Sequence, residues 1–129
     1  MELDYLIQGC IFNLILIVFY LFPGSILGYF LYDNLSIQPQ ISSDLSISNF
    51  TISSNHFYVF IFLSIFVILA YKNTSKINFW INYLFFLSIF LEFLHHFIPN
   101  RGFEFRDLFG NIMGIVVVVI IYKLKKKYE

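Results

Sequence analysis

Charged residues are scarce in this chain. They make up 12% of its 129 residues, whereas hydrophobic residues make up 59% and phenylalanine alone occurs 18 times. An ordinary soluble domain has about 25% charged and about 45–50% apolar residues. A chain this short leaves much of its surface exposed when it folds, so a water-soluble core cannot hide the apolar excess. The composition excludes an ordinary soluble domain and indicates a protein that resides in the lipid bilayer.

The chain has only one cysteine, and its first 71 residues contain no lysine or arginine. The single cysteine, Cys10, excludes an intramolecular disulfide bond. No lysine or arginine precedes Lys72, so the first apolar run lacks the basic start of a signal peptide, and no cleavage motif of the Ala-x-Ala type follows it. We therefore expect this run to be a membrane-spanning helix and not a cleaved leader.

What the sequence does contain is four long apolar runs, in a chain that we treat as a single domain, residues 1–129. A transmembrane helix needs about 20 apolar residues. The runs predict an all-α integral membrane protein with four transmembrane helices, at about 6–30, 54–71, 77–98 and 104–122. Pro23 and Gly24 predict a kink late in the first run. The polar segment 32–53 is expected to be a loosely ordered surface loop, although its alternating residues 46–53 also fit a short strand.

The lysines predict how the helices are oriented. Every lysine lies in the connection between the second and third runs or in the C-terminal tail: Lys72, Lys76, Lys123, Lys125, Lys126 and Lys127. Four spans place these two regions on the same side of the membrane, and clustered positive charge marks the cytoplasmic side. We therefore expect cytoplasmic N- and C-termini, with the loop 32–53 and the connection between the third and fourth helices outside.

Ionisable residues interrupt the last two apolar runs. Such residues are costly in a membrane span and indicate a functional site. At about 100° per residue, Glu92, His95 and His96 lie on one face of the third helix together with Ser88. Polar and small residues share a face of the fourth helix: Asp107, Gly110, Asn111 and Gly114. The two glycines are typical of close helix packing.

A short turn at Pro99–Phe103 predicts that the third and fourth helices form an antiparallel hairpin. In that hairpin His96 lies level with Asp107, and Glu92 lies level with Asn111. Both pairs fall in the outer half of the membrane, with Arg101 at headgroup height. This arrangement predicts a pocket that opens outward, with Arg101 at its mouth and Glu92 deepest. The planar guanidinium of arginine suits a phosphate or a carboxylate, because it donates two hydrogen bonds at once.

Several chemical roles are open to these residues. Glu92 and His96, with Asp107 beside them, are candidates for a catalytic acid–base group. His56, at the outer end of the second helix, is expected to reach the same pocket as a ligand-binding residue. Glu92-x-x-His95 has the spacing of carboxylate-bridged dinuclear metal sites, but the second motif that such a site needs is missing from the sequence. We therefore predict no metal and no cofactor.

The pattern resembles the signature of the VanZ-like family of small bacterial membrane proteins. The matching residues occur in the family's order: Glu92, His96, Pro99, Arg101, Asp107, Asn111 and Gly114. His96 stands where the family most often has glutamine. His56 fits a family histidine near the start of the second helix, but Ile52 and Ser53 replace the aspartate and lysine that usually precede it. The resemblance implies a multi-pass protein of the bacterial cytoplasmic membrane with an outward-facing polar site.

Three functional hypotheses follow. The first is a pocket that binds an anionic cell-envelope component, such as a lipid-linked phosphate or a cell-wall precursor, through Glu92, His96, Arg101, Asp107, Asn111 and His56. The second is a membrane enzyme that acts on lipid-linked substrates with a Glu92–His96 acid–base pair. The third is a structural or accessory subunit without a ligand, in which the same polar residues pair with one another and lock the hairpin. The lipid bilayer is the expected environment, and no nucleic-acid partner is predicted.

Overall fold

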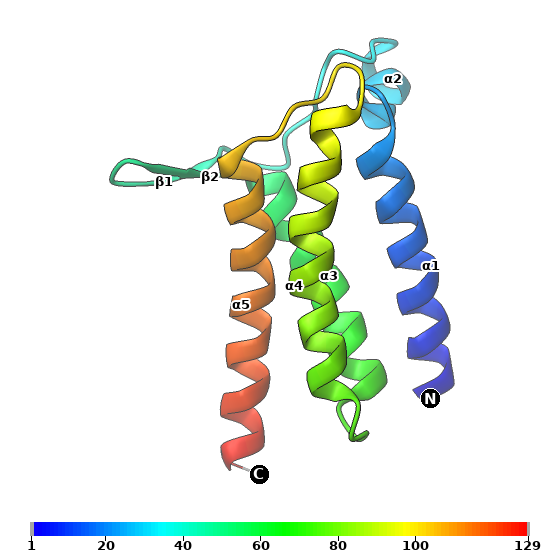
Figure 1. The fold of residues 1–129 in the computed structure, drawn as a ribbon, viewed down its shortest axis with the longest axis vertical. Coiled ribbons are helices and arrows are strands. Elements are labelled where there is room, and N and C mark those ends of the chain that lie inside the picture. The colour runs from blue at the N-terminus through cyan, green and yellow to red at the C-terminus, as the bar shows by residue number, and fades with distance from the viewer. Residues whose placement is uncertain (1, 129) are drawn as a thin grey trace.

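The computed structural model describes residues 2–128, and its helices account for most of the chain (Figure 1). The elements in chain order are α1 (Glu2–Leu21), α2 (Ile26–Tyr32), β1 (Leu45–Ile47), β2 (Phe50–Ile52), α3 (Ser54–Tyr71), α4 (Ile77–Leu94), the 3₁₀ turn η1 (His95–Phe97) and α5 (Phe105–Tyr128). Of these, α1, α3, α4 and α5 are long and apolar enough to cross a membrane. The prediction of four such helices is confirmed.

The first apolar run is divided into two helices. We expected one kinked helix at 6–30, but α1 ends at Leu21 and α2 begins at Ile26. Proline cannot continue the backbone hydrogen-bond ladder, and Gly24 adopts a φ of 101°, which an L side chain rarely tolerates. Ser25 then caps α2 by accepting a hydrogen bond from the Gly28 N–H at 2.9 Å. The result is a break between the two helices at residues 22–25.

The polar segment after α2 contains a small β-hairpin, so the prediction of a loosely ordered loop is wrong at residues 45–52. Leu45 pairs with Ile52 and Ile47 pairs with Phe50 across the antiparallel strands. The ring of Phe50 meets the ring of Phe109 on α5 edge-on, with centroids 5.7 Å apart. A short hairpin is marginal by itself, and this contact with a helix supplies the apolar support it needs.

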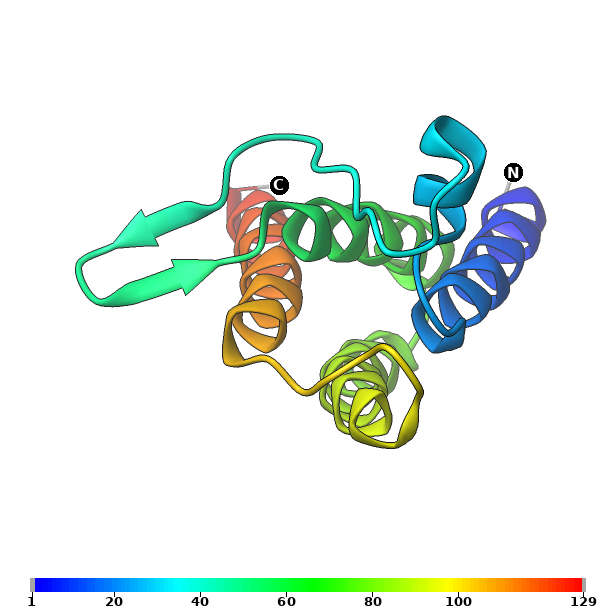
Figure 2. The same ribbon diagram turned by 90° about the horizontal axis from the view of Figure 1, so that it is seen from above.

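Glycines on α5 let α3 approach closely. A Cβ atom at Gly110 would lie 2.7 Å from the Ser53 carbonyl oxygen, and one at Gly114 would lie 2.5 Å from the Phe57 carbonyl oxygen. The predicted close packing therefore involves α3. Viewed from above, α3 lies between α1 and α5, and α4 closes the opposite side (Figure 2). Fully buried apolar side chains from three helices fill the space between them: Phe60, Leu63, Leu84, Leu91 and Ile115.

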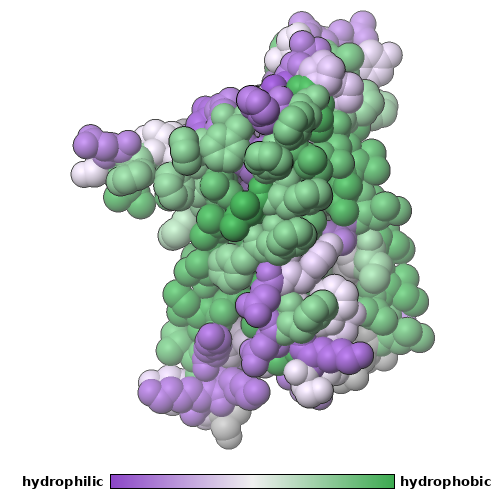
Figure 3. Space-filling model, in the orientation of Figure 1, coloured by the Kyte–Doolittle hydropathy of each residue, from purple (hydrophilic) through white to green (hydrophobic). Residues whose placement is uncertain are grey.

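The outer surface is apolar around the middle of the molecule. Figure 3 shows hydrophobic side chains covering most of the central band, with hydrophilic residues gathered mainly toward the two ends. Leu3, Ile7, Leu14 and Val18 of α1 are each about half exposed or more. Residues that face outward in this way suit lipid and not water. α5 continues to Tyr128, beyond the predicted end at 122, so the C-terminal lysines lie on its last turns.

Candidate functional site

Polar side chains from all four long helices meet near the end of the bundle that carries the β-hairpin. The group, called the polar cluster below, consists of Tyr20, His56, Ser88, Glu92, His95, Asp107 and Asn111. Ser88, Glu92 and Asn111 are fully buried, whereas His56 and Asp107 keep 13% and 14% of their side-chain surface exposed. Such a group in an otherwise apolar bundle is stable only if its members satisfy one another.

Tyr20 and Asn111 connect α1, α3, α4 and α5. The Tyr20 hydroxyl donates to Asn111 Oδ1 at 2.6 Å and also contacts His56 Nδ1. His56 Nδ1 itself lies 3.1 Å from Asn111 Oδ1. The Asn111 amide nitrogen donates to the Ser88 carbonyl at 3.4 Å, which orients the amide with its oxygen toward Tyr20 and His56. This network ties helices together through hydrogen bonds within an apolar bundle.

Glu92 lies level with the start of α5 and not, as was predicted, with Asn111. Its Oε1 accepts a hydrogen bond from the Glu104 N–H at 2.9 Å, and a carboxylate oxygen lies within 4.8 Å of Asp107. Asn111 instead lies next to Ser88. The predicted pairs, Glu92 with Asn111 and His96 with Asp107, are therefore wrong by about one helical turn. The non-helical connection extends over residues 98–104, so it is longer than the predicted turn and displaces α5 along α4.

Of the two adjacent histidines, His95 reaches the polar cluster, whereas the sequence predicted His96. His95 is buried, its ring stacks on Tyr20 with centroids 4.8 Å apart, and its Nδ1 lies 3.4 Å from Glu92 Oε2. His96 is exposed and meets the ring of Phe97. The histidine that lies beside Glu92 is therefore His95 and not His96. The helical wheel placed both histidines in one arc, but the chain tightens to a 3₁₀ turn at His95, which turns the next side chain outward.

Arg101 completes the end of α1. Its guanidinium donates to the carbonyl oxygens of Phe19, Phe22 and Gly24, the last at 2.6 Å. Carbonyls at a helix C-terminus lack intrahelical donors and favour a nearby cation. Burial lowers the pKa of the Arg101 guanidinium, and the negative groups near it act in the opposite direction. Because the ordinary value lies far above neutrality, the side chain remains charged.

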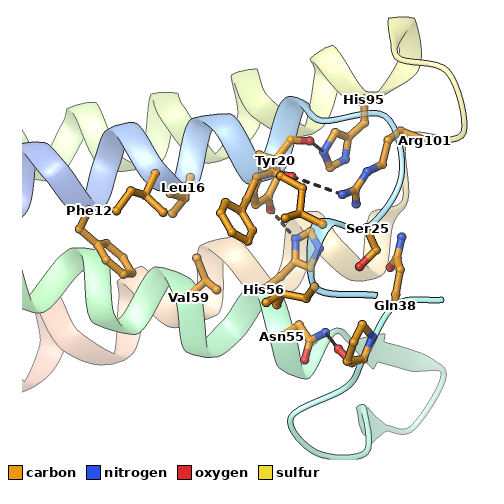
Figure 4. A pocket seen from close by; sticks show the side chains of 15 residues that line it. Phe12, Leu16, Tyr20, Ser25, Gln38, Asn55, His56, Val59, His95 and Arg101 are labelled. Atoms are coloured by element: carbon orange, nitrogen blue, oxygen red, sulfur yellow. Dashed lines mark hydrogen bonds between the residues drawn. The ribbon is translucent and has the colours of Figure 1, made fainter. Parts of the chain in front are cut away.

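A pocket of about 230 Å³ lies beside the polar cluster, between α1, α2 and α3 (Figure 4). Tyr20, His56, His95 and Arg101 reach it from the side of the cluster. Among the described residues, Glu92, Asp107 and Asn111 lie outside its lining. Glu92 was predicted to lie deepest in an outward-facing pocket, but it does not line this one, which lies along α1.

Three ionisable side chains converge beside Tyr20, and one of them, His56, also lines the pocket. His56, Glu92 and Asp107 each present one nitrogen or oxygen atom, and these atoms lie within 4.8 Å of one another. His56 Nε2 is 3.5 Å from Asp107 Oδ2. Imidazole and carboxylate groups at such separations are a donor set suited to a metal ion. All three were predicted from the sequence as residues of one site, but a metal donor set was not predicted, because the three residues come from three different helices.

Tyr20 is the central residue that sequence reasoning missed. It lies near the end of an apolar run where tyrosines are common as interfacial anchors, so its type and position carry no specific signal. Only the packing of α1 against α3 brings it to His56 and Asn111. The other predicted site residues are divided by the structure: His56, Glu92, Asp107 and Asn111 are brought together, Arg101 lies at the pocket, and His96 lies apart.

The fold and the polar cluster define a multi-pass membrane protein with a buried ionisable site between its helices. Comparison with protein families identifies that class further, because the model of the VanZ/LLP1 family matches residues 10–126. The chain belongs to this family, as the signature between Glu92 and Gly114 indicated. No curated protein and no solved structure matches the chain.

Proposed function

We propose that this VanZ/LLP1 protein binds an anionic, lipid-linked component of the bacterial cell envelope in the pocket along α1. The observation that carries the proposal is the composition of the pocket wall. One end is apolar, with Phe12, Leu16 and Val59, and the other end holds the charged Arg101. An amphiphile with an apolar chain and an anionic head matches this gradient, because binding sites pair apolar walls with a few placed polar groups.

The polar end of the pocket supports an anionic head group. His56 and His95 line it together with Arg101, and Ser25, Gln38 and Asn55 add further polar side chains. Arg101 retains its positive charge while it donates to the backbone of α1. The carboxylates of Glu92 and Asp107 lie outside the lining. The pocket therefore offers hydrogen-bond donors and positive charge to a ligand without presenting a carboxylate to it.

The distribution of lysines supports an outward-facing pocket in the bacterial cytoplasmic membrane. The lysines of the 72–76 connection and of the α5 terminus lie at the end of the bundle that also carries both chain termini (Figure 1). The pocket lies toward the opposite end, with α2 and the β-hairpin. Under the positive-inside rule, the termini are cytoplasmic and the pocket faces the outside, where α4 and α5 form the outward hairpin.

The arrangement does not favour a membrane enzyme with a Glu92–His96 acid–base pair. His96 is exposed, and Glu92 is buried outside the pocket lining. A general acid or base must come within hydrogen-bonding distance of the group that it protonates or deprotonates. Neither residue meets that requirement for a ligand held along α1.

The binding of a polyprenyl phosphate, compared with an uncharged polyprenol of equal length, tests the proposal. Native mass spectrometry of the purified protein measures both affinities in the same detergent. We expect the phosphate to bind more tightly and Arg101→Gln to reduce this preference by about tenfold, equivalent to about 1.4 kcal/mol. Because the ratio is taken within one variant, a general loss of stability does not affect it. Equal binding of the two lipids to the wild-type protein would refute the proposal.

A pocket-filling variant locates the binding site. Val59→Trp places an indole inside the pocket and is expected to abolish binding of the polyprenyl phosphate. Ile65→Trp is the matched control, because Ile65 lies on the same helix, is 39% exposed and does not line the pocket. Unchanged affinity in Val59→Trp, or an equal loss in both variants, would contradict binding at this pocket.

A further inference from the structure

We propose that His56, Glu92 and Asp107 bind one divalent transition-metal ion, such as Zn²⁺ or Mn²⁺, inside the polar cluster. This site shares His56 with the wall of the lipid pocket, but the proposal does not depend on lipid binding. The proposal rests on two features of the geometry. The hydrogen bonds around His56 direct a free nitrogen lone pair at Asp107, and a buried oxygen of Glu92 has no hydrogen-bond donor.

The hydrogen-bond network determines the tautomer of His56. The Asn111 oxygen accepts only, and the single proton of the Tyr20 hydroxyl is donated to it. The contact of His56 Nδ1 with both of these oxygen atoms is favourable only if Nδ1 carries a proton. In the neutral ring Nε2 then has a lone pair, which faces Asp107 Oδ2 at 3.5 Å. Metal-binding histidines have this arrangement, with the second nitrogen donating to a neighbouring group.

Glu92 supplies the second, independent observation. Its side chain is fully buried, and Oε2 makes no hydrogen bond among the described residues. A neutral His95 ring leaves Oε2 without a donor, because its single proton is then on Nε2, which donates to the Tyr20 carbonyl at 2.8 Å. In neutral His95 the nitrogen that faces Glu92 therefore carries a lone pair and no proton. A buried carboxylate without a donor is costly, and a bound cation removes that cost.

Charge and separation both fit a divalent ion. Two carboxylates with a neutral imidazole present two negative charges, which one divalent ion balances. Arg106 Nε pairs with Asp107 Oδ1 at 3.7 Å and offsets part of this charge, while Asp107 Oδ2 faces His56 Nε2 at 3.5 Å. Ligand atoms that are each at about 2.1 Å from a tetrahedral ion lie about 3.4 Å apart. The observed separations, within 4.8 Å, would have to shorten by about 1 Å through side-chain movement.

The donor types select the class of metal, and the partial exposure provides access. One imidazole with two carboxylates suits Zn²⁺, Mn²⁺ or Fe²⁺, whereas Mg²⁺ and Ca²⁺ prefer oxygen ligands alone. His56 and Asp107 each keep a small part of their side chains exposed, so an ion can enter beside Asp107. Three protein ligands leave positions open for water or for a ligand group. The site is therefore a metal centre with free coordination positions.

Calorimetric titration with the metal alone tests the proposal. The full-length protein in detergent is stripped with a chelator and titrated with ZnCl₂ and, separately, with MnCl₂. We expect saturable binding of one ion per chain by at least one of the two metals. His56→Gln and Asp107→Asn are expected to weaken this binding by more than about tenfold. His96→Gln is the matched control, because it removes an exposed histidine outside the cluster.

Two further measurements keep the test decisive if a ligand variant is unstable. Tyr20→Phe retains the ring and removes only the hydroxyl that orients His56, and loss of such a partner lowers metal affinity by about 10- to 100-fold. The absorption spectrum of the Co²⁺-loaded wild-type protein reports nitrogen and oxygen coordination without any variant. Absence of saturable binding by the wild-type protein would overturn the proposal. Binding that persists unchanged in Asp107→Asn, or that is lost equally in His96→Gln, would also overturn it.

Discussion

At the scale of single residues, Asn111 joins α5 to the other three long helices through hydrogen bonds. It is fully buried on α5, and its amide reaches Tyr20 on α1, His56 on α3 and Ser88 on α4. An asparagine supplies both a donor and an acceptor from one small group, which suits a position surrounded by three helices. In an apolar bundle the cost of leaving such partners unpaired exceeds the value of each hydrogen bond.

Asn111→Leu is expected to destabilise the protein by about 1–3 kcal/mol, because the Ser88 carbonyl and the Tyr20 hydroxyl lose partners at nearly constant side-chain volume. Thermal unfolding in detergent measures the effect. Asn82→Leu is the control, since Asn82 is exposed on α4 and the same substitution there leaves the cluster intact. Equal stability of the two variants would show that the network does not contribute to folding.

Glu92→Gln separates stability from metal binding. In the variant, the amide oxygen still accepts the hydrogen bond from the Glu104 N–H. The amide nitrogen replaces Glu92 Oε2, which has no donor in the wild-type protein, and donates a hydrogen bond to His95 Nδ1. We expect the metal-free variant to be as stable as the wild type or more stable by about 0.5–1.5 kcal/mol. Chelator-treated samples in thermal unfolding provide the measurement. A clear loss of stability would mean that the carboxylate charge itself is needed for folding.

At the scale of elements, the contact between α3 and α5 determines where the site residues lie. Gly110 and Gly114 bring the α5 backbone against Ser53 and Phe57, and this places Asn111 and Asp107 beside His56. The hydrogen bond from the Ser53 N–H to the Arg106 carbonyl, at 3.1 Å, holds the first turns of both helices together. The glycine stripe thus connects helix packing to the geometry of the polar cluster.

Gly114→Ala is expected to destabilise the protein by about 1–3 kcal/mol, because its Cβ atom would meet the Phe57 carbonyl at 2.5 Å and the helices must separate. Gly102→Ala adds the same methyl group where nothing lies within 4 Å. Thermal unfolding of both variants provides the comparison, and only the first is expected to lower the melting temperature. If the two variants melt alike, the close approach of α3 and α5 is not a constraint on packing.

Helical periodicity predicted which residues share a face but not which helix that face meets. The face formed by Gly110, Asn111 and Gly114 was identified from the sequence, yet it packs on α3 and not mainly on α4. The exchange of His95 for His96 arises from one 3₁₀ turn, which a uniform helical wheel does not contain. Contacts between distant segments depend on the lengths of connections and on tertiary packing. Tyr20 belongs to the cluster because α1 packs against α3, which the sequence pattern does not show.

At the scale of the whole molecule, hydropathy and length predicted most of the fold. The four membrane-length helices, the membrane environment and the family follow from patterns that extend over many residues. Short polar segments were predicted less well, because their structure depends on a few local contacts. The β-hairpin at 45–52 is held by the Phe50–Phe109 contact, which no local pattern reveals. The orientation in the membrane remains a prediction from the lysines.

Cysteine labelling in intact cells tests that orientation. In a Cys10→Ser background, Ser43→Cys marks the segment before β1, and Tyr128→Cys marks the end of α5, where the side chain is 81% exposed. The six lysines all lie at the end of the bundle that carries the end of α5, and the positive-inside rule places that end in the cytoplasm. A membrane-impermeant maleimide is therefore expected to label the Ser43→Cys protein in intact cells and the Tyr128→Cys protein only after permeabilisation. The reverse pattern would place the pocket on the cytoplasmic side and would exclude an outer envelope ligand. Labelling of both cysteines in intact cells would indicate that one of the four helices does not cross the membrane.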